Sequence, residues 1–205
     1  MKAKYLMTHS LLSAWLFLLT ENPYADSTTE DRSVEDFLRV LRREPTETTE
    51  AMQKGLDFEN DIALLLEGKA PEHVEWFEAE KRIADRVKGG ILQCALTRTV
   101  TVSGTELLLY GRLDALKAGT VYDFKFSGTY DRGKYFGSTQ HPMYLELEPE
   151  AKRFTYLVSN GKDLWTETYR RDETRSIIPT IADFLRWLEA TGTREIYEKY
   201  WEALR

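Results

Sequence analysis

Cysteine is nearly absent from this sequence. The 205 residues contain one, Cys94, so the chain can form no internal disulfide and no zinc or iron-sulfur site built from several cysteines. Small secreted domains commonly depend on disulfides, whereas thiols stay reduced in the cytoplasm. We therefore expect a cytoplasmic protein without an iron-sulfur cluster.

Long apolar runs are also missing. Residues 11–19 follow two lysines and imitate a signal peptide, but His9, Ser10 and Ser13 interrupt the pattern. The run is too short to cross a bilayer, so we expect no membrane association. Thr8 or Ser10 can instead cap a buried first helix, which we favour over the signal peptide. Its expected apolar face consists of Leu11, Leu12, Trp15, Leu18 and Leu19.

Internal repeats, low-complexity tracts and a phosphate-binding loop of the Gly-X-X-X-X-Gly-Lys-(Ser/Thr) type are absent as well. These absences exclude solenoids and a P-loop motor. The six prolines and twelve glycines are scattered, and 42% of the residues are hydrophobic, which is typical of a folded globular chain. The length predicts a single domain over residues 1–205.

The net charge of −6 argues against a nucleic-acid partner, but the charge is unevenly distributed. Residues 21–80 contain 6 basic and 17 acidic side chains, whereas residues 81–171 contain 15 and 10. The basic excess lies in the part of the chain that carries the motifs below. It permits a DNA partner without demonstrating one, because uneven charge is often only a solvated face.

Helical spacing dominates the first third of the chain. We expect a polar loop at residues 22–29, and then a helix over residues 33–41 that starts at Ser33 with Asp36 as its capping-box partner. A further helix is predicted over residues 46–66, ending near Gly68.

Strand patterns follow. Residues 97–102, 106–110, 115–117 and 121–126 are rich in β-branched or alternating apolar residues and predict strands joined by tight turns. A short helix over residues 138–147 can hold Pro142 in its first turn. The last segments are a hairpin around Asn160-Gly161 and two terminal helices. The expected fold class is α/β, with a small mixed β-sheet flanked by helices.

Two carboxylates and a lysine stand out on the predicted strands. Asp123 and Lys125 are two residues apart, so they project from one face, and the neighbouring strand can bring Asp114 beside them. Converging carboxylates repel each other unless a cation lies between them. A hard divalent cation, Mg²⁺ or Mn²⁺, prefers such oxygen ligands and can promote hydrolysis of a phosphodiester.

The spacing Gly-X-X-Asp114, followed by Asp123-Phe124-Lys125, resembles the signature of the PD-(D/E)XK nuclease superfamily, with Gly-X-X-Asp in place of Pro-Asp. The resemblance covers residues 5–170 and implies a restriction-endonuclease-like core. Three further segments are similar to motifs of the RecB-like and phage-recombination exonuclease branch: Gly55 with Glu59, Gln140 with Tyr144, and the helix that opens with His9-Ser10.

This resemblance implies roles for particular residues. Lys125 would be the catalytic lysine, and Gln140 and Tyr144, which share a helix face, would contact DNA or order the site. The implied metal ligands are the carboxylates of Glu59, Asp114 and Asp123 and the backbone carbonyl of Phe124.

Ordinary structural readings compete with these roles. Asp-X-Lys in a strand is usually a surface ion pair, and an acidic helix face around Glu59 needs no function. His141 fits a local hydrogen-bond partner better than a catalytic base, and Trp187 and Trp201 fit the core better than a base-stacking surface. Basic residues could bind phosphate or be merely solvated: Arg132, Lys134, Lys152 and Arg153.

The expected function is that of a metal-dependent DNA nuclease, an exonuclease in phage or prophage recombination, repair or defence. The alternative is a nuclease-fold module that binds DNA or a protein without cleaving. An RNA-directed or structure-specific endonuclease is a third reading. Homo-oligomers and a recombination partner protein both stay open.

Overall fold

The computed structural model describes residues 4–20 and 27–203 and alternates helices with strands along the chain. In chain order the elements are β1 (Tyr5–Thr8), α1 (His9–Leu18), α2 (Ser27–Leu41), α3 (Glu50–Leu66), the 3-10 helix η1 (Val74–Trp76), α4 (Phe77–Val87), β2 (Ile91–Val102), β3 (Thr105–Lys117), β4 (Thr120–Phe126), α5 (Gln140–Leu147), β5 (Arg153–Ser159), β6 (Leu164–Arg170), α6 (Ile178–Ala190) and α7 (Arg194–Trp201).

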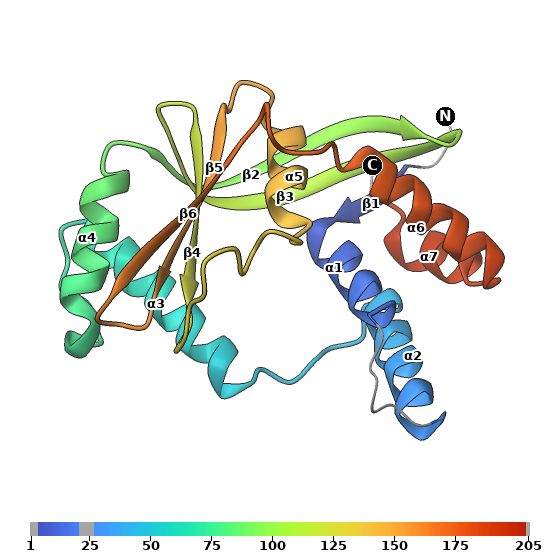
Figure 1. The fold of residues 1–205 in the computed structure, drawn as a ribbon, viewed down its shortest axis with the longest axis horizontal. Coiled ribbons are helices and arrows are strands. Elements are labelled where there is room, and N and C mark those ends of the chain that lie inside the picture. Colours follow the sequence, from blue (N-terminus) through green and yellow to red (C-terminus); the bar gives the residue numbers. More distant parts are fainter. Residues whose placement is uncertain (1–3, 21–26, 204–205) are drawn as a thin grey trace.

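The strands form one mixed six-stranded sheet, so the predicted α/β class is confirmed (Figure 1). Its order is β1-β3-β4-β5-β6, and β2 pairs separately with β3. β1 lies parallel to β3, and β4 lies parallel to β5. Parallel neighbours need a long crossover, and between β4 and β5 that crossover contains α5.

Helices cover both faces of the sheet around β4. On one face, Tyr144 of α5 packs in the same buried cluster as Val121. On the other face, Phe58 of α3 and Ile83 of α4 share a cluster with Phe124. Since alternate residues of a strand face opposite sides, Asp123 and Lys125 lie on the α5 side of β4, as the period of the sequence predicts.

A third cluster lies at the β1 edge, where α1, α2, α6 and α7 gather on one side of the molecule in Figure 1. The Trp15 ring packs against Phe184, with centroids 5.4 Å apart, and Phe37 meets Phe184 edge-on. Thr8 caps α1 by accepting a hydrogen bond from the backbone N–H of Leu11 at 3.2 Å. The prediction of a buried first helix is therefore confirmed for most of its apolar face.

Leu19 is the exception on that face, because it follows the last residue of α1 and is 48% exposed. Within the part of the chain that the structure describes, no helix is both long and apolar enough to cross a bilayer.

The predicted start of the second helix is wrong. α2 begins at Ser27, so Ser33 lies inside it and cannot serve as its N-terminal cap. Residues 27–29, expected in a loop, are helical, and residues 21–26 lie outside the described part. The polar residues ahead of Ser33 cost a helix only tenths of a kcal/mol each, about 0.5 by typical propensities. Packing of Phe37 and Leu41 in the third cluster, at the β1 edge, outweighs that cost.

Three elements have no counterpart in the sequence prediction: β1, η1 and α4. β1 has only four residues and runs straight into α1, so its strand pattern is too short to recognise alone. β2 begins at Ile91, earlier than predicted, and β3 continues unbroken through Gly111. Neighbouring strands sustain these extensions, since β3 pairs with β2 along almost its whole length.

Candidate active site

The two strands that carry the predicted site residues separate at Asp114. β3 and β4 pair at three positions, and the pair nearest the site is Ala115 with Tyr122. At the next position Asp114 would lie opposite Asp123. There the side chain of Asp114 takes the place of the backbone pairing between the strands. Its Oδ2 atom accepts a hydrogen bond of 2.7 Å from the backbone N–H of Phe124. Both aspartates thus lie at the point where the strands part.

A distortion of β3 accompanies this separation. The β2–β3 pairing omits Gln93 and Asp114, and Gln93 adopts a left-handed conformation with φ 48°. On either side of Asp114 the strand exchanges faces: Leu113 packs in the α5 cluster, whereas Ala115 packs in the cluster beneath α3 and α4. The kink therefore turns Asp114 toward β4 rather than leaving it on a regular face.

Asp123 and Lys125 form a close ion pair, with Lys125 Nζ 2.7 Å from Asp123 Oδ2. Asp123 is 7% exposed. Its Oδ2 is buried and has Lys125 as its charged partner. The other carboxylate oxygen, Oδ1, accepts a hydrogen bond from the side-chain amide of Gln140.

Gln140 and Tyr144 lie on one face of α5, and both reach the strands below it. Tyr144 donates a hydrogen bond of 2.7 Å from its hydroxyl to the backbone carbonyl of Arg112, and its ring lies against Gly111. Pro142 falls in the first turn of α5, as predicted, so it removes no hydrogen bond from the helix interior. The two predicted residues therefore order β3 and Asp123 directly.

Glu59 approaches from α3. Burial raises the pKa of its carboxyl, repulsion from Asp123 adds to the increase, and Lys125 and Arg112 oppose it. Asp57, two residues earlier, instead accepts a hydrogen bond of 2.7 Å from the side chain of Gln53. Of these two acidic residues of α3, Glu59 is the one that interacts with the site.

The site contains more acidic than basic groups. Burial, followed by repulsion from Asp123 and Glu59, raises the pKa of Asp114 well above its ordinary value. Burial also raises the pKa of Asp123, although Lys125 opposes the increase. Burial by itself would lower the pKa of Lys125, but attraction to Asp123 outweighs it and the net change is upward. Three carboxyls thus share the ammonium group of Lys125, and the charge of Arg112 acts on Glu59 as well.

These residues suit a hard divalent cation in their chemistry. A cation would relieve the repulsion that Asp114 and Glu59 each experience from Asp123, and carboxylate oxygens are the ligands that such a cation prefers. Among residues 4–20 and 27–203, however, no three His, Cys, Asp or Glu side chains form a ready-made ligand group. The carboxylate oxygens are of the type that Mg²⁺ or Mn²⁺ prefers, but the side chains do not already lie close enough together to hold the ion.

His9 and Thr139 also belong to this region, although the sequence pattern did not single out His9 as a site residue. Thr139 donates a hydrogen bond of 2.9 Å to the backbone carbonyl of His9, and its hydroxyl lies 2.7 Å from that of Ser13. Burial, and then the nearby charge of Lys125, lowers the pKa of His9 to about 4. The His9-Ser10 pair was the only signal in the sequence for this contact between α1 and α5.

His141 is buried, with its ring stacked on Tyr169 at a centroid distance of 3.8 Å. Its Nδ1 lies 3.4 Å from the hydroxyl of Tyr156. Burial lowers the pKa of His141 to about 4, so the ring is neutral at pH 7. It is part of an aromatic cluster beneath α5, which agrees with a structural role.

The two tryptophans that the sequence assigned to the core rather than to a base-stacking surface lie there. Trp201 is buried in the third cluster, at the β1 edge, and Trp187 packs against that cluster. Lys152 and Arg153 lie exposed at the start of β5.

Comparisons with known proteins show a shared fold but no family. Neither a known family model nor a curated protein matches the chain. The crystal structure of SSO0001 aligns with 91% of this chain and 78% of that one, at a TM-score of 0.53 and 13% sequence identity. The structure of Rai1 from Scheffersomyces stipitis covers 93% of this chain and 62% of that one, at a TM-score of 0.36 and 11% identity, which is too distant to bear on the fold. The chain has the fold of the first of these structures.

Proposed function

We propose that this chain is a metal-dependent deoxyribonuclease of the PD-(D/E)XK type. The observation that carries the proposal is the meeting of Asp114, Asp123 and Lys125 where β3 and β4 part, with Asp114 repelled by the carboxyls of both Asp123 and Glu59. Burying several like charges without a function would be costly, and strongly raised carboxyl pKa values are typical of catalytic sites.

In this proposal Glu59, Asp114, Asp123 and the carbonyl of Phe124 hold Mg²⁺ or Mn²⁺. When bound, such an ion polarises a phosphoryl oxygen and lowers the pKa of a water molecule. The raised pKa of Lys125 keeps its side chain charged at neutral pH, which favours offsetting charge on the phosphate over acting as a base. Gln140 holds Asp123 in place, and Tyr144 holds β3.

The substrate class follows from the resemblance and from the basic excess of residues 81–171. We propose exonucleolytic cleavage of DNA in the cytoplasm, in phage or prophage recombination, repair or defence. Assembly with further copies, or with a recombination partner, would be compatible with this function.

The test combines metal binding with cleavage. Calorimetric titration with Mn²⁺ is expected to give a binding signal for the wild type that Asp114→Asn and Asp123→Asn lose. Linear DNA should be digested only with metal present, and Lys125→Ala should reduce the rate by about 100-fold or more. Asp57→Asn is the matched control, because Asp57 lies on α3 near Glu59 but pairs with Gln53. Full activity of Asp123→Asn or Lys125→Ala would refute the proposal.

A second candidate is a nuclease-fold module that binds DNA or a protein without cleaving it. Two observations favour it: the net charge of −6, and the lack of a ready-made ligand group among the described residues. Binding to DNA ends with no product in Mg²⁺ or Mn²⁺ would support this candidate. Parallel digestion of linear DNA, circular DNA and RNA separates the exonuclease from an RNA-directed or structure-specific endonuclease.

A further inference from the structure

A loop of residues 127–138 borders the candidate active site. It starts two residues after Lys125 on β4 and ends two residues before Gln140 on α5. Its contents differ from those of an ordinary polar connection, since it contains three aromatic and two basic residues. These are Tyr130, Arg132, Lys134, Tyr135 and Phe136.

A buried carboxylate on β6 holds this loop. Glu167 is 8% exposed and accepts hydrogen bonds from both side-chain and backbone donors. Burial by itself would raise the pKa of Glu167, but these bonds outweigh it and hold the pKa below its ordinary value, so the group is ionised at neutral pH. The donors are the Tyr130 hydroxyl at 2.7 Å, the backbone N–H of Tyr135 at 3.1 Å, the backbone N–H of Gly133 at 3.2 Å, and the Tyr169 hydroxyl.

Ring stacking fixes both halves of the loop to the sheet. Tyr130 stacks on Trp165 with centroids 5.6 Å apart, and Tyr135 stacks on Tyr156 at 4.3 Å. A backbone hydrogen bond of 3.0 Å from Phe136 to the carbonyl of Gly133 closes a turn between them. The loop backbone is therefore ordered by contacts on both sides of Phe136.

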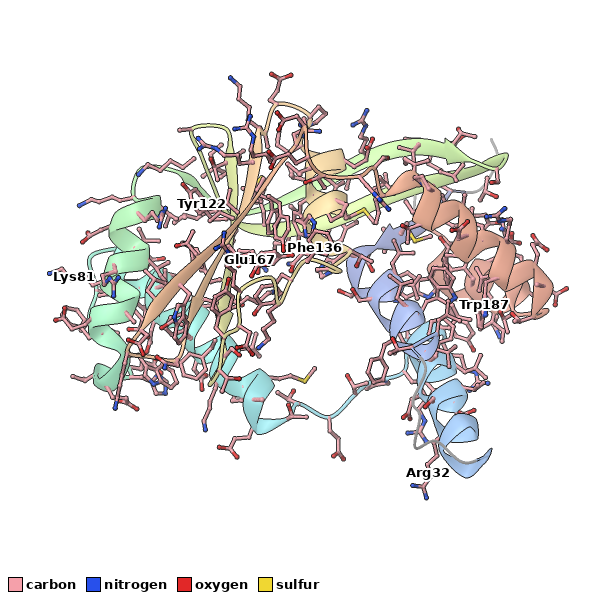
Figure 2. All side chains as sticks on the ribbon, viewed as in Figure 1. Arg32, Lys81, Tyr122, Phe136, Glu167 and Trp187 are labelled. Atoms are coloured by element: carbon pink, nitrogen blue, oxygen red, sulfur yellow. The ribbon has the colours of Figure 1, made fainter. Side chains whose placement is uncertain are left out.

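Phe136 itself turns outward from this ordered backbone and is 79% exposed. In the view of Figure 2 it lies between Glu167 and α1. A single exposed apolar side chain is ordinary on a protein surface. Phe136 differs because a buried carboxylate and two ring stacks hold its backbone beside the active-site residues, so a ligand that met this ring would find it already in position.

The loop also offers cationic groups. Lys134 is engaged within the loop, because its Nζ donates to the hydroxyl of Ser127 at 2.7 Å and to the carbonyl of Thr129 at 3.2 Å. Arg132 is exposed and makes no hydrogen bond or ion pair with another residue of the described part. One aromatic face and one uncommitted guanidinium therefore lie four residues apart on a rigid loop.

We propose that Phe136 is a stacking platform for an unpaired base at the end of a DNA strand, with Arg132 contacting the adjoining backbone. Aromatic side chains stack on bases of every sequence, and cations beside them follow the phosphates. A base within a duplex has both faces covered by its neighbours, so the exposed ring selects unpaired DNA. This inference rests on the proposed function and narrows its substrate to a single-stranded end.

The test measures binding separately from cleavage. A labelled single-stranded oligodeoxynucleotide with a terminal 2-aminopurine is titrated into Lys125→Ala protein, in which cleavage is blocked, in the presence of Mg²⁺. Stacking is expected to quench the 2-aminopurine fluorescence. Adding Phe136→Leu, which keeps an apolar side chain but removes the aromatic face, should weaken binding by on the order of tenfold and abolish the quenching.

Three controls make the result specific to stacking. Phe136→Trp should bind at least as well as the parent protein. Val74→Ala changes another apolar side chain, 77% exposed in η1, and should leave binding unchanged. An oligonucleotide whose terminal base is missing should bind equally to the parent and Phe136→Leu proteins.

The outcomes separate this inference from the proposed function. Equal binding and equal quenching by the parent and Phe136→Leu proteins would overturn the platform, even if the wild type digests DNA with metal. Conversely, Phe136-dependent binding by a chain that never cleaves would support the platform and refute the nuclease. Failure of the parent protein to bind single strands at all would also overturn the platform.

Discussion

The ring of Tyr144 occupies the space that a side chain at Gly111 would need. A Cβ atom at Gly111 would lie 3.0 Å from two ring carbons of Tyr144 and 2.9 Å from a methyl carbon of Leu147. These contacts are shorter than ordinary van der Waals separations, so the glycine of the Gly-X-X-Asp motif permits α5 to approach β3. That approach brings Gln140 to Asp123.

Gly111→Ala is therefore expected to lower the free energy of unfolding by about 1–3 kcal/mol, because α5 must move away from β3. Gly55→Ala is the matched control: it lies within α3, with nothing within 4 Å of the added carbon, and should stabilise the chain by about 0.5–1 kcal/mol. Urea unfolding measures both. Equal destabilisation by the two substitutions would contradict the role given to Tyr144.

Asp114 is predicted to serve both the fold and the charge of the site, and two substitutions separate these roles. Asp114→Asn retains an oxygen that can accept from the N–H of Phe124 but removes one of three repelling carboxyls. Its stability without metal should equal or exceed that of the wild type. Asp114→Ala leaves the buried N–H unpaired and should cost about 1–3 kcal/mol. Thermal unfolding in chelator measures the difference, and two equally destabilised variants would argue against the repulsion.

Glu80 is expected to make stability fall with rising pH. It is fully buried on α4, and neither carboxyl oxygen has a hydrogen-bond partner among the described residues. Burial, and then repulsion from Asp61, raises its pKa from 4.5 to about 7. The folded state therefore keeps a proton that the unfolded state loses above 4.5, so the free energy of unfolding falls between 4.5 and about 7 and then levels off.

Glu80→Gln removes this dependence while keeping the shape of the side chain. The variant should match the wild type near pH 4 and exceed it by roughly 1–3 kcal/mol near pH 8, from the energy of a pKa shift of this size. Denaturant unfolding across this range provides the measurement. Parallel pH profiles for the two proteins would show that Glu80 is not protonated in the fold.

Arg171 holds the C-terminal end of α5 and is expected to be important for stability. Its guanidinium donates to the backbone carbonyls of Ala151, Leu145 and Glu148 at 2.7, 2.6 and 2.7 Å. Arg171→Ala should cost about 2–4 kcal/mol, since several charge-assisted hydrogen bonds to carbonyls are lost.

The neighbouring Arg170 provides the control for this prediction. It is 59% exposed and pairs with Asp172 on the surface, so Arg170→Ala should change stability by less than about 1 kcal/mol. Hydrogen exchange should show faster opening of α5 in Arg171→Ala alone. Similar exchange in both variants would contradict the anchoring role.

The parts of the site that depend on local geometry could be predicted from the sequence. Side chains two apart in a strand share a face, which placed Asp123 and Lys125 together opposite Phe124. The tight turns were recognisable for the same reason: Ser103 and Gly104 both adopt positive φ angles, as the Ser-Gly signal between two strands suggests.

The sequence by itself determined the α/β class, the first buried helix, the hairpins and the face of β4 that carries the charged pair, because each follows from short-range periodicity and turn chemistry. Only the tertiary structure decided the kink opposite Gln93, the bond from Gln140 to Asp123, and the hold of Glu167 on the loop with Phe136. The two hydrogen bonds join residues that are 17 and 32 positions apart in the sequence. The kink depends on how β3 separates from β4. Their energies arise from burial and pairing that exist only once the sheet and its helices have packed together.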